Sequence, residues 1–222
     1  MAQAKRVFLT GGTGYMGSRL AIELRHRGHE VRALVRQGSE HRLPPDCTAV
    51  LGDALDHRTY VADVPPAATF VHLVGVSHPS PTKAAQFRSI DLASAREAVA
   101  AATAAGVGHF VYVSVAQPAP IMKAYIAART EAEALIRESA LTATIFRPWY
   151  VLGPGHRWPV VLLPLYWIAD LVPATHGTAQ RLGLVTLRQM VCAVIWAVEN
   201  PSEGVRVLGV PDIRAATLAA GS

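Results

Sequence analysis

A glycine-rich run is the part of this sequence whose residue types and spacing point most directly to chemistry. Residues Thr10 to Gly17 read Thr-Gly-Gly-Thr-Gly-Tyr-Met-Gly, directly after a short apolar run and at the start of a helix-like stretch. Glycines permit a tight turn, a close approach of backbone to ligand and close packing of helix on strand. Because free N–H groups at a helix start bind anions, the pattern predicts a dinucleotide pyrophosphate site. The residues expected to form it are Gly11, Thr13, Gly14, Tyr15, Met16 and Gly17.

The residue at the end of the second expected strand indicates which dinucleotide is bound. Arg36 stands about 20 residues beyond the glycines, where an Asp or Glu would bind the ribose 2′-hydroxyl of NAD. A guanidinium can instead pair with the 2′-phosphate of NADP. The sequence therefore favours NADP(H), with a solvated arginine at a strand end as the alternative.

Short Val-rich runs alternate with Ala-rich helical patterns through the first two thirds of the chain, and these elements must position the glycines. Near-continuous apolar strands are typical of a parallel sheet covered on both faces. The alternation predicts an α/β fold, a Rossmann-like doubly wound parallel sheet with a small C-terminal lobe. Strands are expected over residues 6–10, 30–36, 49–51, 69–74, 109–115 and 142–146, and helices over 15–27, 56–62, 83–105 and 122–139.

The alternation ends after Pro148, where glycines and prolines interrupt the chain. We expect a dinucleotide-binding Rossmann domain over residues 1–151 and a small substrate or partner lobe over 152–222, with a helix at 186–199 and a strand at 205–210. The segment 158–173 carries Trp158 and Trp167 among many apolar residues. It is expected to form an apolar pocket wall or a partner-facing patch, or else to pack against the sheet edge.

Composition argues against several other classes of protein. With 51% hydrophobic and 17% charged residues, the 222-residue chain can bury a core and is not disordered. Cys47 and Cys192 form no disulfide framework, and the nine histidines show no metal-ligand spacing. The net charge of +5 is scattered, which favours an anionic small ligand over nucleic acid. No apolar run is long enough for a membrane span, and no leader pattern opens the chain, so a cytoplasmic location is expected.

Further motifs follow the glycines in order: Val50-Leu-Gly-Asp53, Phe110-Val-Tyr-Val-Ser114, Tyr125-x-x-x-Arg129, Phe146-Arg-Pro148 and Val151-Leu-Gly-Pro-Gly155. With them the chain resembles the short-chain dehydrogenase/reductase superfamily over nearly its whole length, specifically its extended and atypical branch of NmrA-like and epimerase-like proteins. The resemblance implies that Asp53 contacts the adenine, that Val74 and Gly75 pass the nicotinamide ribose, and that Pro148 lies beside the nicotinamide. Asp53 has an alternative role as a cap for the helix expected from Asp56.

The same resemblance places the reaction centre at Tyr125 and Arg129, which lie one helical turn apart and so share a face. In the family, the Tyr exchanges a proton with the substrate oxygen, while a Lys lowers its pKa and holds the ribose hydroxyls. Arg129 replaces that Lys and keeps the charge, but its planar fork differs in reach, and an unreactive helix face is the alternative. Ser114 matches the family's substrate-binding hydroxyl in one register. In the register of the extended enzymes the position falls on Val115, which points to the other side of the strand.

These features together predict an NADP(H)-binding oxidoreductase that moves a hydride to or from a carbonyl or alcohol carbon of a partly apolar small molecule. A non-catalytic NADP(H)-binding sensor or assembly protein is the alternative, which the Arg at position 129 favours. A sugar-nucleotide epimerase is a third option, for which the lobe after Leu152 is small. A homodimer through the helices that carry Ala98 and Ala132 would match the family's usual contact.

Overall fold

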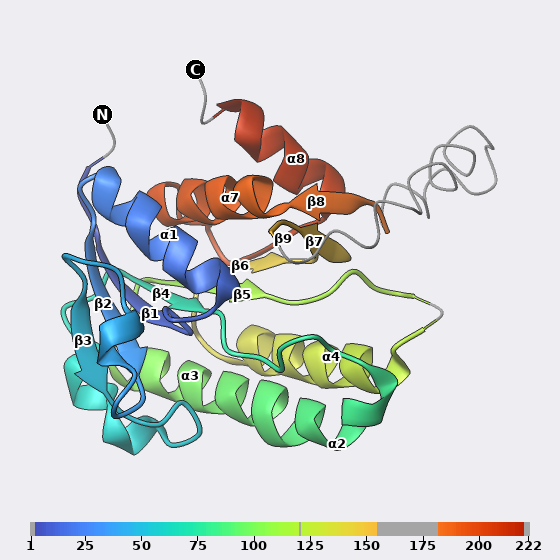
Figure 1. Ribbon diagram of the computed structural model, residues 1–222, viewed down its shortest axis with the longest axis horizontal. Helices are drawn as coiled ribbons and strands as arrows, with labels where there is room; N and C mark the ends of the chain where they lie inside the picture. Colours follow the sequence, from blue (N-terminus) through green and yellow to red (C-terminus); the bar gives the residue numbers. More distant parts are fainter. Residues whose placement is uncertain (1–2, 120, 155–181, 220–222) are drawn as a thin grey trace.

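A parallel sheet forms the middle layer of the protein (Figure 1). The computed structural model describes residues 3–119, 121–154 and 182–219. All six strand pairings of the sheet are parallel, in the order β3-β2-β1-β4-β5-β6-β9. The strands are β1 (Arg6–Thr10), β2 (Glu30–Val35), β3 (Thr48–Leu51), β4 (Thr69–His72), β5 (His109–Val113), β6 (Ala143–Phe146) and β9 (Val205–Leu208).

Helices cover both faces of this sheet (Figure 1). One layer holds α1 (Tyr15–His26) and α7 (Leu187–Glu199), with α8 (Val210–Ala219) packed on α7. The other layer holds α2 (Ala84–Gln86), α3 (Ala93–Ala104) and α4 (Lys123–Glu138). The arrangement confirms the predicted α/β, Rossmann-like doubly wound sheet. A separate two-stranded parallel sheet pairs β7 (Tyr150–Leu152) with β8 (Leu184–Thr186).

The burial of β1 explains why its sequence reads as one apolar run. Val7 and Leu9 belong to the core under α1 and α7, whereas Phe8 between them belongs to the core under α3 and α4. Each of the three is at most 1% exposed. Because successive side chains of a strand point to opposite faces, a sheet covered on both sides needs apolar residues at every position.

Two segments expected to be helices have a different local structure. Residues 56–62 form two short 3₁₀ turns, His57–Thr59 and Val61–Asp63, so the predicted helix is wrong there. The Thr59 hydroxyl donates to the Asp56 carbonyl at 2.7 Å, and such local side-chain bonds compete with helical ones. Within the expected helix 83–105, a π-helical segment, Phe87–Leu92, lies between α2 and α3.

The described residues after β8 join the main body through the sheet and through α7. Strand β9 pairs with β6, and α7 contacts α1. The Lys5 ammonium donates to the carbonyls of Val198 and Glu199 at 2.8 and 3.1 Å, which ties the end of α7 to the start of β1. The division of the chain at residues 151 and 152 stays a prediction, and the apolar segment 158–173 lies outside the described residues.

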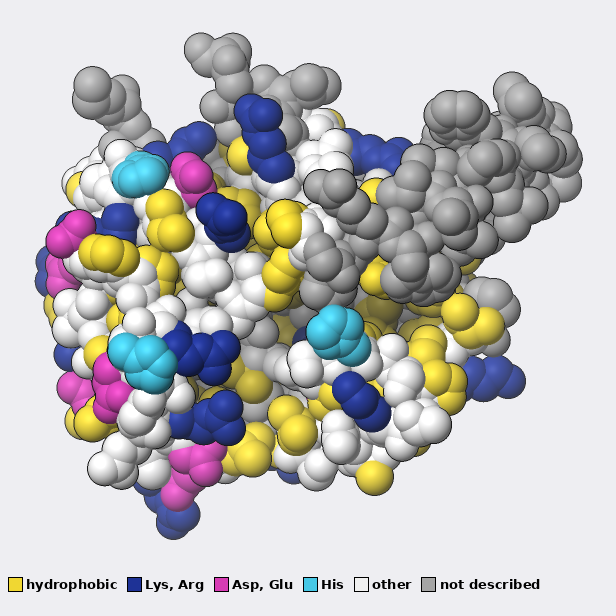
Figure 2. Space-filling view, viewed as in Figure 1, with side chains coloured by type: hydrophobic (Ala, Val, Ile, Leu, Met, Phe, Trp, Pro, Cys, Tyr) yellow, Lys and Arg dark blue, Asp and Glu magenta, His cyan; other side chains and the backbone are white. Residues whose placement is uncertain are grey.

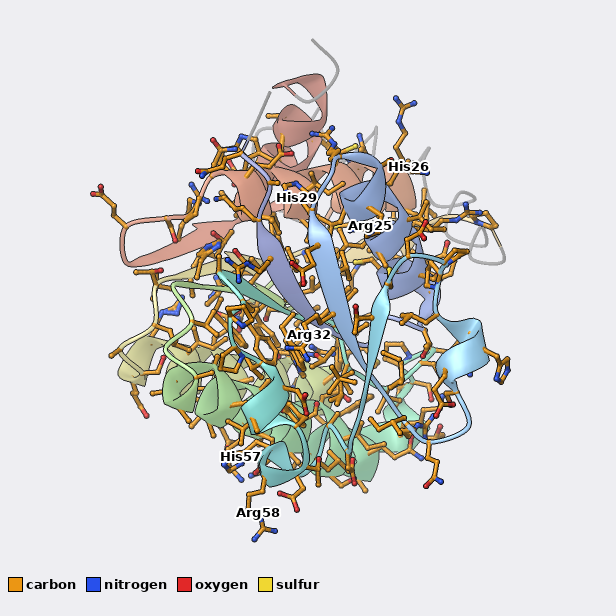
Figure 3. The ribbon with its side chains drawn as sticks, turned by 90° about the vertical axis from the view of Figure 1, so that its left-hand side faces the viewer. Arg25, His26, His29, Arg32, His57 and Arg58 are labelled. Atoms are coloured by element: carbon orange, nitrogen blue, oxygen red, sulfur yellow. The ribbon has the colours of Figure 1, made fainter. Side chains whose placement is uncertain are left out.

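Charged side chains are dispersed over the described surface. Figure 2 shows Lys and Arg scattered among apolar and uncharged side chains over one face. Figure 3 shows Arg25, His26 and His29 near one end of the molecule and His57 and Arg58 near the other. None of the described helices combines the length and the apolar character that crossing a membrane requires.

Candidate functional site

The glycine-rich turn joins β1 to α1 at the carboxyl edge of the sheet. Gly11 has a φ of 78°, which favours glycine, and its carbonyl accepts the N–H of Gly14 at 2.9 Å. A Cβ atom on Gly17 would overlap the Gly11 carbonyl oxygen, and one on Gly11 would lie 2.9 Å from the carbonyl carbon of Leu73. Both glycines therefore allow the turn, α1 and the loop after β4 to come together.

The start of α1 presents backbone donors rather than side chains. Gly14 is the N-cap residue and makes no side-chain cap, and the first turn contains no acidic residue. The N–H groups of this turn therefore carry their partial positive charge to the carboxyl edge of the sheet. Backbone donors at the start of a helix are groups that bind a pyrophosphate, so the chemistry of this backbone cradle suits that part of a dinucleotide.

The other residues of the run differ in how they meet this cradle. Thr13 is half-buried, and Met16 packs against the core under α1 and α7. Tyr15 is 39% exposed and reaches across to the segment after β7, since a Cβ on Gly153 would overlap its hydroxyl. Gly153, directly after β7, therefore lies beside the glycine-rich turn.

Two side chains expected at the adenosine end follow neighbouring strands. Arg36 comes directly after β2, is exposed, and makes no ion pair with another described residue. Asp53 follows β3, where its carboxylate accepts the Leu55 N–H at 2.9 Å and so holds a turn. The cap of the next segment is Asp56, whose side chain accepts the Arg58 N–H, and not Asp53. The guanidinium of Arg36 is thus available to an anion at this edge.

The loop after β4 lies between the glycine turn and α4. Leu73 donates its N–H to the Thr10 carbonyl at 3.1 Å, and Val74 and Gly75 follow it. A Cβ on Gly75 would overlap Nη2 of Arg129. This loop therefore offers backbone to a ligand, directly above a buried guanidinium.

Helix α4 presents a row of functional side chains toward the π-helical segment Phe87–Leu92. Tyr125 and Arg129 share one face of α4, and Phe87 and Asp91 lie opposite them. The rings of Phe87 and Tyr125 meet edge-on with centroids 5.0 Å apart, and Arg129 Nη2 lies 2.5 Å from Asp91 Oδ1. The wide π turn thus aligns an aromatic pair and an ion pair along α4.

The Arg129 side chain is only 8% exposed and connects three parts of the protein. Its Nη1 donates to the Val113 carbonyl at the end of β5, at 2.9 Å, while Asp91 Oδ2 accepts the Val76 N–H at 3.0 Å. The guanidinium carbon lies 5.1 Å from the centroid of the Tyr125 ring, a cation–π contact. Arg129 thus joins α4 to β5 and, through Asp91, to the loop after β4.

A second buried carboxylate, Glu133, lies one turn further along α4 and gathers the polar groups that follow β5 and β6. Its side chain is 3% exposed and forms an ion pair with Arg147, whose Nη2 lies 2.5 Å away. The Ser114 hydroxyl donates to it at 2.7 Å and the Gln117 amide at 2.9 Å. The Ser114 proton is therefore held by a carboxylate. Pro148, expected beside the nicotinamide, is buried next to Arg147.

A neutral histidine lies behind these pairs, on β4. His72 is buried, with Nδ1 2.8 Å from the Thr10 hydroxyl and its ring stacked on Tyr112. Burial, with a smaller contribution from the charge of Arg129, lowers the pKa of His72 to about 3. Burial also raises the pKa of Tyr112 to about 12, although Arg129 acts in the opposite direction. Both side chains are therefore uncharged at neutral pH.

A pocket of about 470 Å³ opens on the side of α4 nearest to Arg147. It is lined by Gln117, Pro118, Ala119, Lys123, Ile126, Ala127 and Arg147. Its lining therefore combines two cations and an amide with a short apolar wall.

One group among the described residues brings potential metal ligands together. Atoms of Asp56, His57 and Glu97 lie within 4.8 Å of one another. His57 Nδ1 lies 2.5 Å from a Glu97 oxygen, and Arg58 donates to Asp56 at 2.8 Å. Both carboxylates are thus already engaged within the protein.

The structure brings the predicted glycines together with Val74 and Gly75, and places Tyr125 against Arg129. Sequence reasoning missed Asp91 and Glu133, and it named Arg147 only as part of the motif Phe146-Arg-Pro148. Glu133 carried a signal, because it continues the four-residue spacing of Tyr125 and Arg129. Asp91 carried none, since its partner is 38 residues away.

Comparison with known proteins identifies the class that this fold and site define. A family model described as NAD(P)H-binding matches residues 11–157, so the chain belongs to that family. A short-chain dehydrogenase/reductase superfamily protein from Agrobacterium tumefaciens with bound NAD shares the fold at 18% identity, with a TM-score of 0.65 over 96% of this chain and 81% of that one. A UDP-galactose 4-epimerase shares it at 17% identity, with a TM-score of 0.69 over 91% and 76%. The predicted resemblance to that superfamily is confirmed.

Two curated relatives are reductases by name. The ceramide reductase of Caulobacter vibrioides is 26% identical over 89% of this chain, and the 3-diazoavenalumate denitrifying reductase of a Streptomyces species is 29% identical over 90%. The matched region spans 62% of the first relative and 74% of the second. Beyond the NAD(P)H-binding family, the chain is thus similar to proteins that are named reductases.

Proposed function

We propose that this protein is an NADP(H)-dependent oxidoreductase that reduces a carbonyl group or oxidises the matching alcohol. The observation that carries the proposal is the backbone cradle at Gly11 to Gly17, which adjoins the loop next to Arg129 and Tyr125. The names of the two reductase relatives support the reaction class. Arg36 supports NADP(H) over NAD(H), because it is an exposed cation at the end of β2 without a carboxylate partner among the described residues.

We assign the cofactor contacts along this edge of the sheet. Gly11, Gly14 and Gly17 would hold the pyrophosphate with the first turn of α1, and Arg36 and Asp53 would meet the adenosine end. Val74, Gly75 and Pro148 would lie toward the nicotinamide. NADPH, when bound, supplies a hydride to the substrate carbon.

Proton transfer is assigned to Tyr125. Its hydroxyl would give a proton to the carbonyl oxygen as that oxygen gains charge, and would take it back in alcohol oxidation. Arg129 acts here as a positioning residue, because its guanidinium faces the Tyr125 ring while its N–H groups bind Val113 and Asp91. Ser114, whose proton Glu133 holds, has a lone pair for a substrate donor rather than a proton to give.

The experiment that tests this function is the loss of NADPH absorbance with a broad panel of aldehydes and ketones. Tyr125→Phe keeps the ring that contacts Phe87 and Arg129 but removes the proton. We expect it to lose about 10²–10⁴-fold in rate while NADPH affinity is retained. Tyr60→Phe is the matched control, since the Tyr60 hydroxyl is buried without a hydrogen-bond partner among the described residues.

Two results would contradict the proposal. Equal rates for the wild type and Tyr125→Phe would remove Tyr125 from the reaction. Tight NADPH binding without turnover of any compound would favour the non-catalytic sensor instead. The comparisons do not favour that alternative, since two curated relatives that match 89% and 90% of this chain carry reductase names.

A further inference from the structure

The pocket beside α4 combines apolar and polar lining residues. Four of them are apolar, Pro118, Ala119, Ile126 and Ala127, and three are polar, Gln117, Lys123 and Arg147. Its volume of about 470 Å³ is in the range of small-molecule sites. The pocket therefore suits a molecule with an apolar body and one polar end.

Two of the polar lining residues, Gln117 and Arg147, are held by the buried carboxylate of Glu133. Arg147 contacts this carboxylate with Nε at 3.0 Å and Nη2 at 2.5 Å, and the Gln117 amide donates to it at 2.9 Å. The Thr130 hydroxyl contacts the Gln117 Oε1 atom at 2.5 Å. Because these hydrogen bonds already fix the side chains of Gln117 and Arg147, the two lose little conformational freedom when a ligand binds.

The charge around the pocket is positive. Lys123 at the start of α4 is exposed and makes no ion pair within the described parts of the chain. Glu133 faces two arginines, Arg147 and, at 3.4 Å, Arg137, so its single charge cannot balance both. A ligand with one negative charge would offset this excess of positive charge.

We infer that this pocket binds the carboxylate of a partly apolar substrate, with Lys123 as the counter-ion and Ile126 and Ala127 against the apolar body. The inference rests on the proposed function and names its substrate class, an oxo or hydroxy compound that bears a carboxylate. Gln117, which lines the pocket, and Ser114 donate to the same carboxylate oxygen, at 2.9 and 2.7 Å. The pocket thus shares a buried carboxylate with Ser114 of the proposed reaction centre.

Benzoate and benzamide, which differ in charge but hardly in shape, are the probes for this pocket. Calorimetric titration of the protein saturated with NADPH should show benzoate binding about tenfold more tightly than benzamide. Lys123→Met should remove most of that difference. Arg6→Met should not, because Arg6 is an exposed cation at the opposite, amino end of β1.

A second pair of variants tests the position of the ligand by size. Ala127→Trp would fill the pocket and should abolish benzoate binding, whereas Ala134→Trp, at an exposed position further along α4, should leave it intact. In turnover assays with an aryl oxo acid and the matching uncharged ketone, Lys123→Met should raise KM for the acid alone and leave kcat nearly unchanged.

The outcomes separate this inference from the proposed function. If NADPH binds and ketones are reduced, but benzoate and benzamide bind equally or Lys123→Met changes neither, the carboxylate site is refuted and the oxidoreductase stands. Phenyl phosphate binding far more tightly than benzoate would also overturn the assignment to a carboxylate. Failure to bind NADPH would refute the proposed function, while the benzoate titrations still test the pocket without the cofactor.

Discussion

The glycine turn at α1 and the face of α4 are built from different chemical groups, although both contact the loop after β4. The turn offers backbone groups, and it can form because Gly11 and Gly17 have no side chain. The α4 face is made of buried charges, Arg129 with Asp91 and Glu133 with Arg147. Backbone N–H groups keep their polarity at any pH, and water can satisfy those of a first helical turn when no ligand is bound.

Buried ions behave differently, because each needs its partner to offset the loss of hydration. The Asp91 side chain is fully buried and that of Arg129 is 8% exposed, so neither has water as a substitute. Substitutions in the turn should therefore destabilise the protein through steric crowding, and substitutions on the α4 face should do so by leaving a buried charge unpaired. Substitutions can separate these two modes of failure.

The largest effect is expected when one ion of the α4 face loses its partner. Asp91→Ala leaves Arg129 buried without its carboxylate and the Val76 N–H without an acceptor. We expect the free energy of unfolding to fall by about 3–5 kcal/mol, measured in urea. The double variant Asp91→Leu with Arg129→Met should recover most of this loss, because no unpaired charge remains.

An exposed ion pair supplies the control for that experiment. Asp63, whose side chain is 51% exposed, lies 3.3 Å from Arg32. Asp63→Ala should lower the free energy of unfolding by less than about 1 kcal/mol. Similar losses for Asp91→Ala and Asp63→Ala would show that the α4 pair is not a buried contact of the kind described.

Gly17→Ala tests the glycine turn by crowding alone. The added methyl would overlap the Gly11 carbonyl oxygen, so we expect a loss of about 1–3 kcal/mol in stability together with loss of NADPH binding. Gly108→Ala is the control, since the nearest atom to its Cβ is the Ala68 carbonyl oxygen at an ordinary 3.5 Å. A Gly17→Ala protein that binds NADPH normally would refute the role of this turn.

Arg36 carries the one positive side-chain charge assigned to the cofactor site. If it meets the 2′-phosphate, NADPH should bind more tightly than NADH by about 1.5–3 kcal/mol, and Arg36→Ala should remove the preference. Calorimetric titration with both cofactors measures it, and Arg6→Ala controls for the loss of one positive charge. An unchanged ratio in Arg36→Ala would return Arg36 to a solvated residue.

The smallest expected effect, counted per pH unit, concerns His72, which lies behind the ion pairs of α4. Its pKa is about 3 in the folded protein, against an ordinary value near 6.5, so the unfolded chain binds the extra proton between these values. Stability should therefore fall as the pH drops below about 6.5, by up to about 1.4 kcal/mol per pH unit from this residue. Urea unfolding at pH 7 and pH 5 measures how much the free energy of unfolding falls between them. This fall should be smaller in His72→Gln than in the wild type. It should be unchanged in His41→Gln, a control at an exposed position. An equal pH dependence of stability in the wild type and in both variants would contradict the conclusion that His72 is buried and neutral.

Local patterns in the sequence were enough for the sheet and the cofactor turn. The apolar runs of β1 and β5 predicted buried parallel strands, and the glycine spacing predicted the turn, because both depend on neighbours within a few residues. The prediction of a helix over 56–62 was wrong because other local contacts decided the structure there. Side-chain hydrogen bonds from Asp56 and Thr59 outweighed the weak helical pattern of this segment.

Tertiary structure alone decided which charges the α4 face would bury. The sequence placed Tyr125 and Arg129 on one side of a helix, but it gave no sign that a π turn would aim Asp91 at that arginine. Nor did it show that β9 would add a seventh strand beside β6. These contacts join residues 38 to 62 positions apart. A pairing over such a separation is favoured only once the core has brought the segments together and excluded water from between them, and no local pattern encodes that condition.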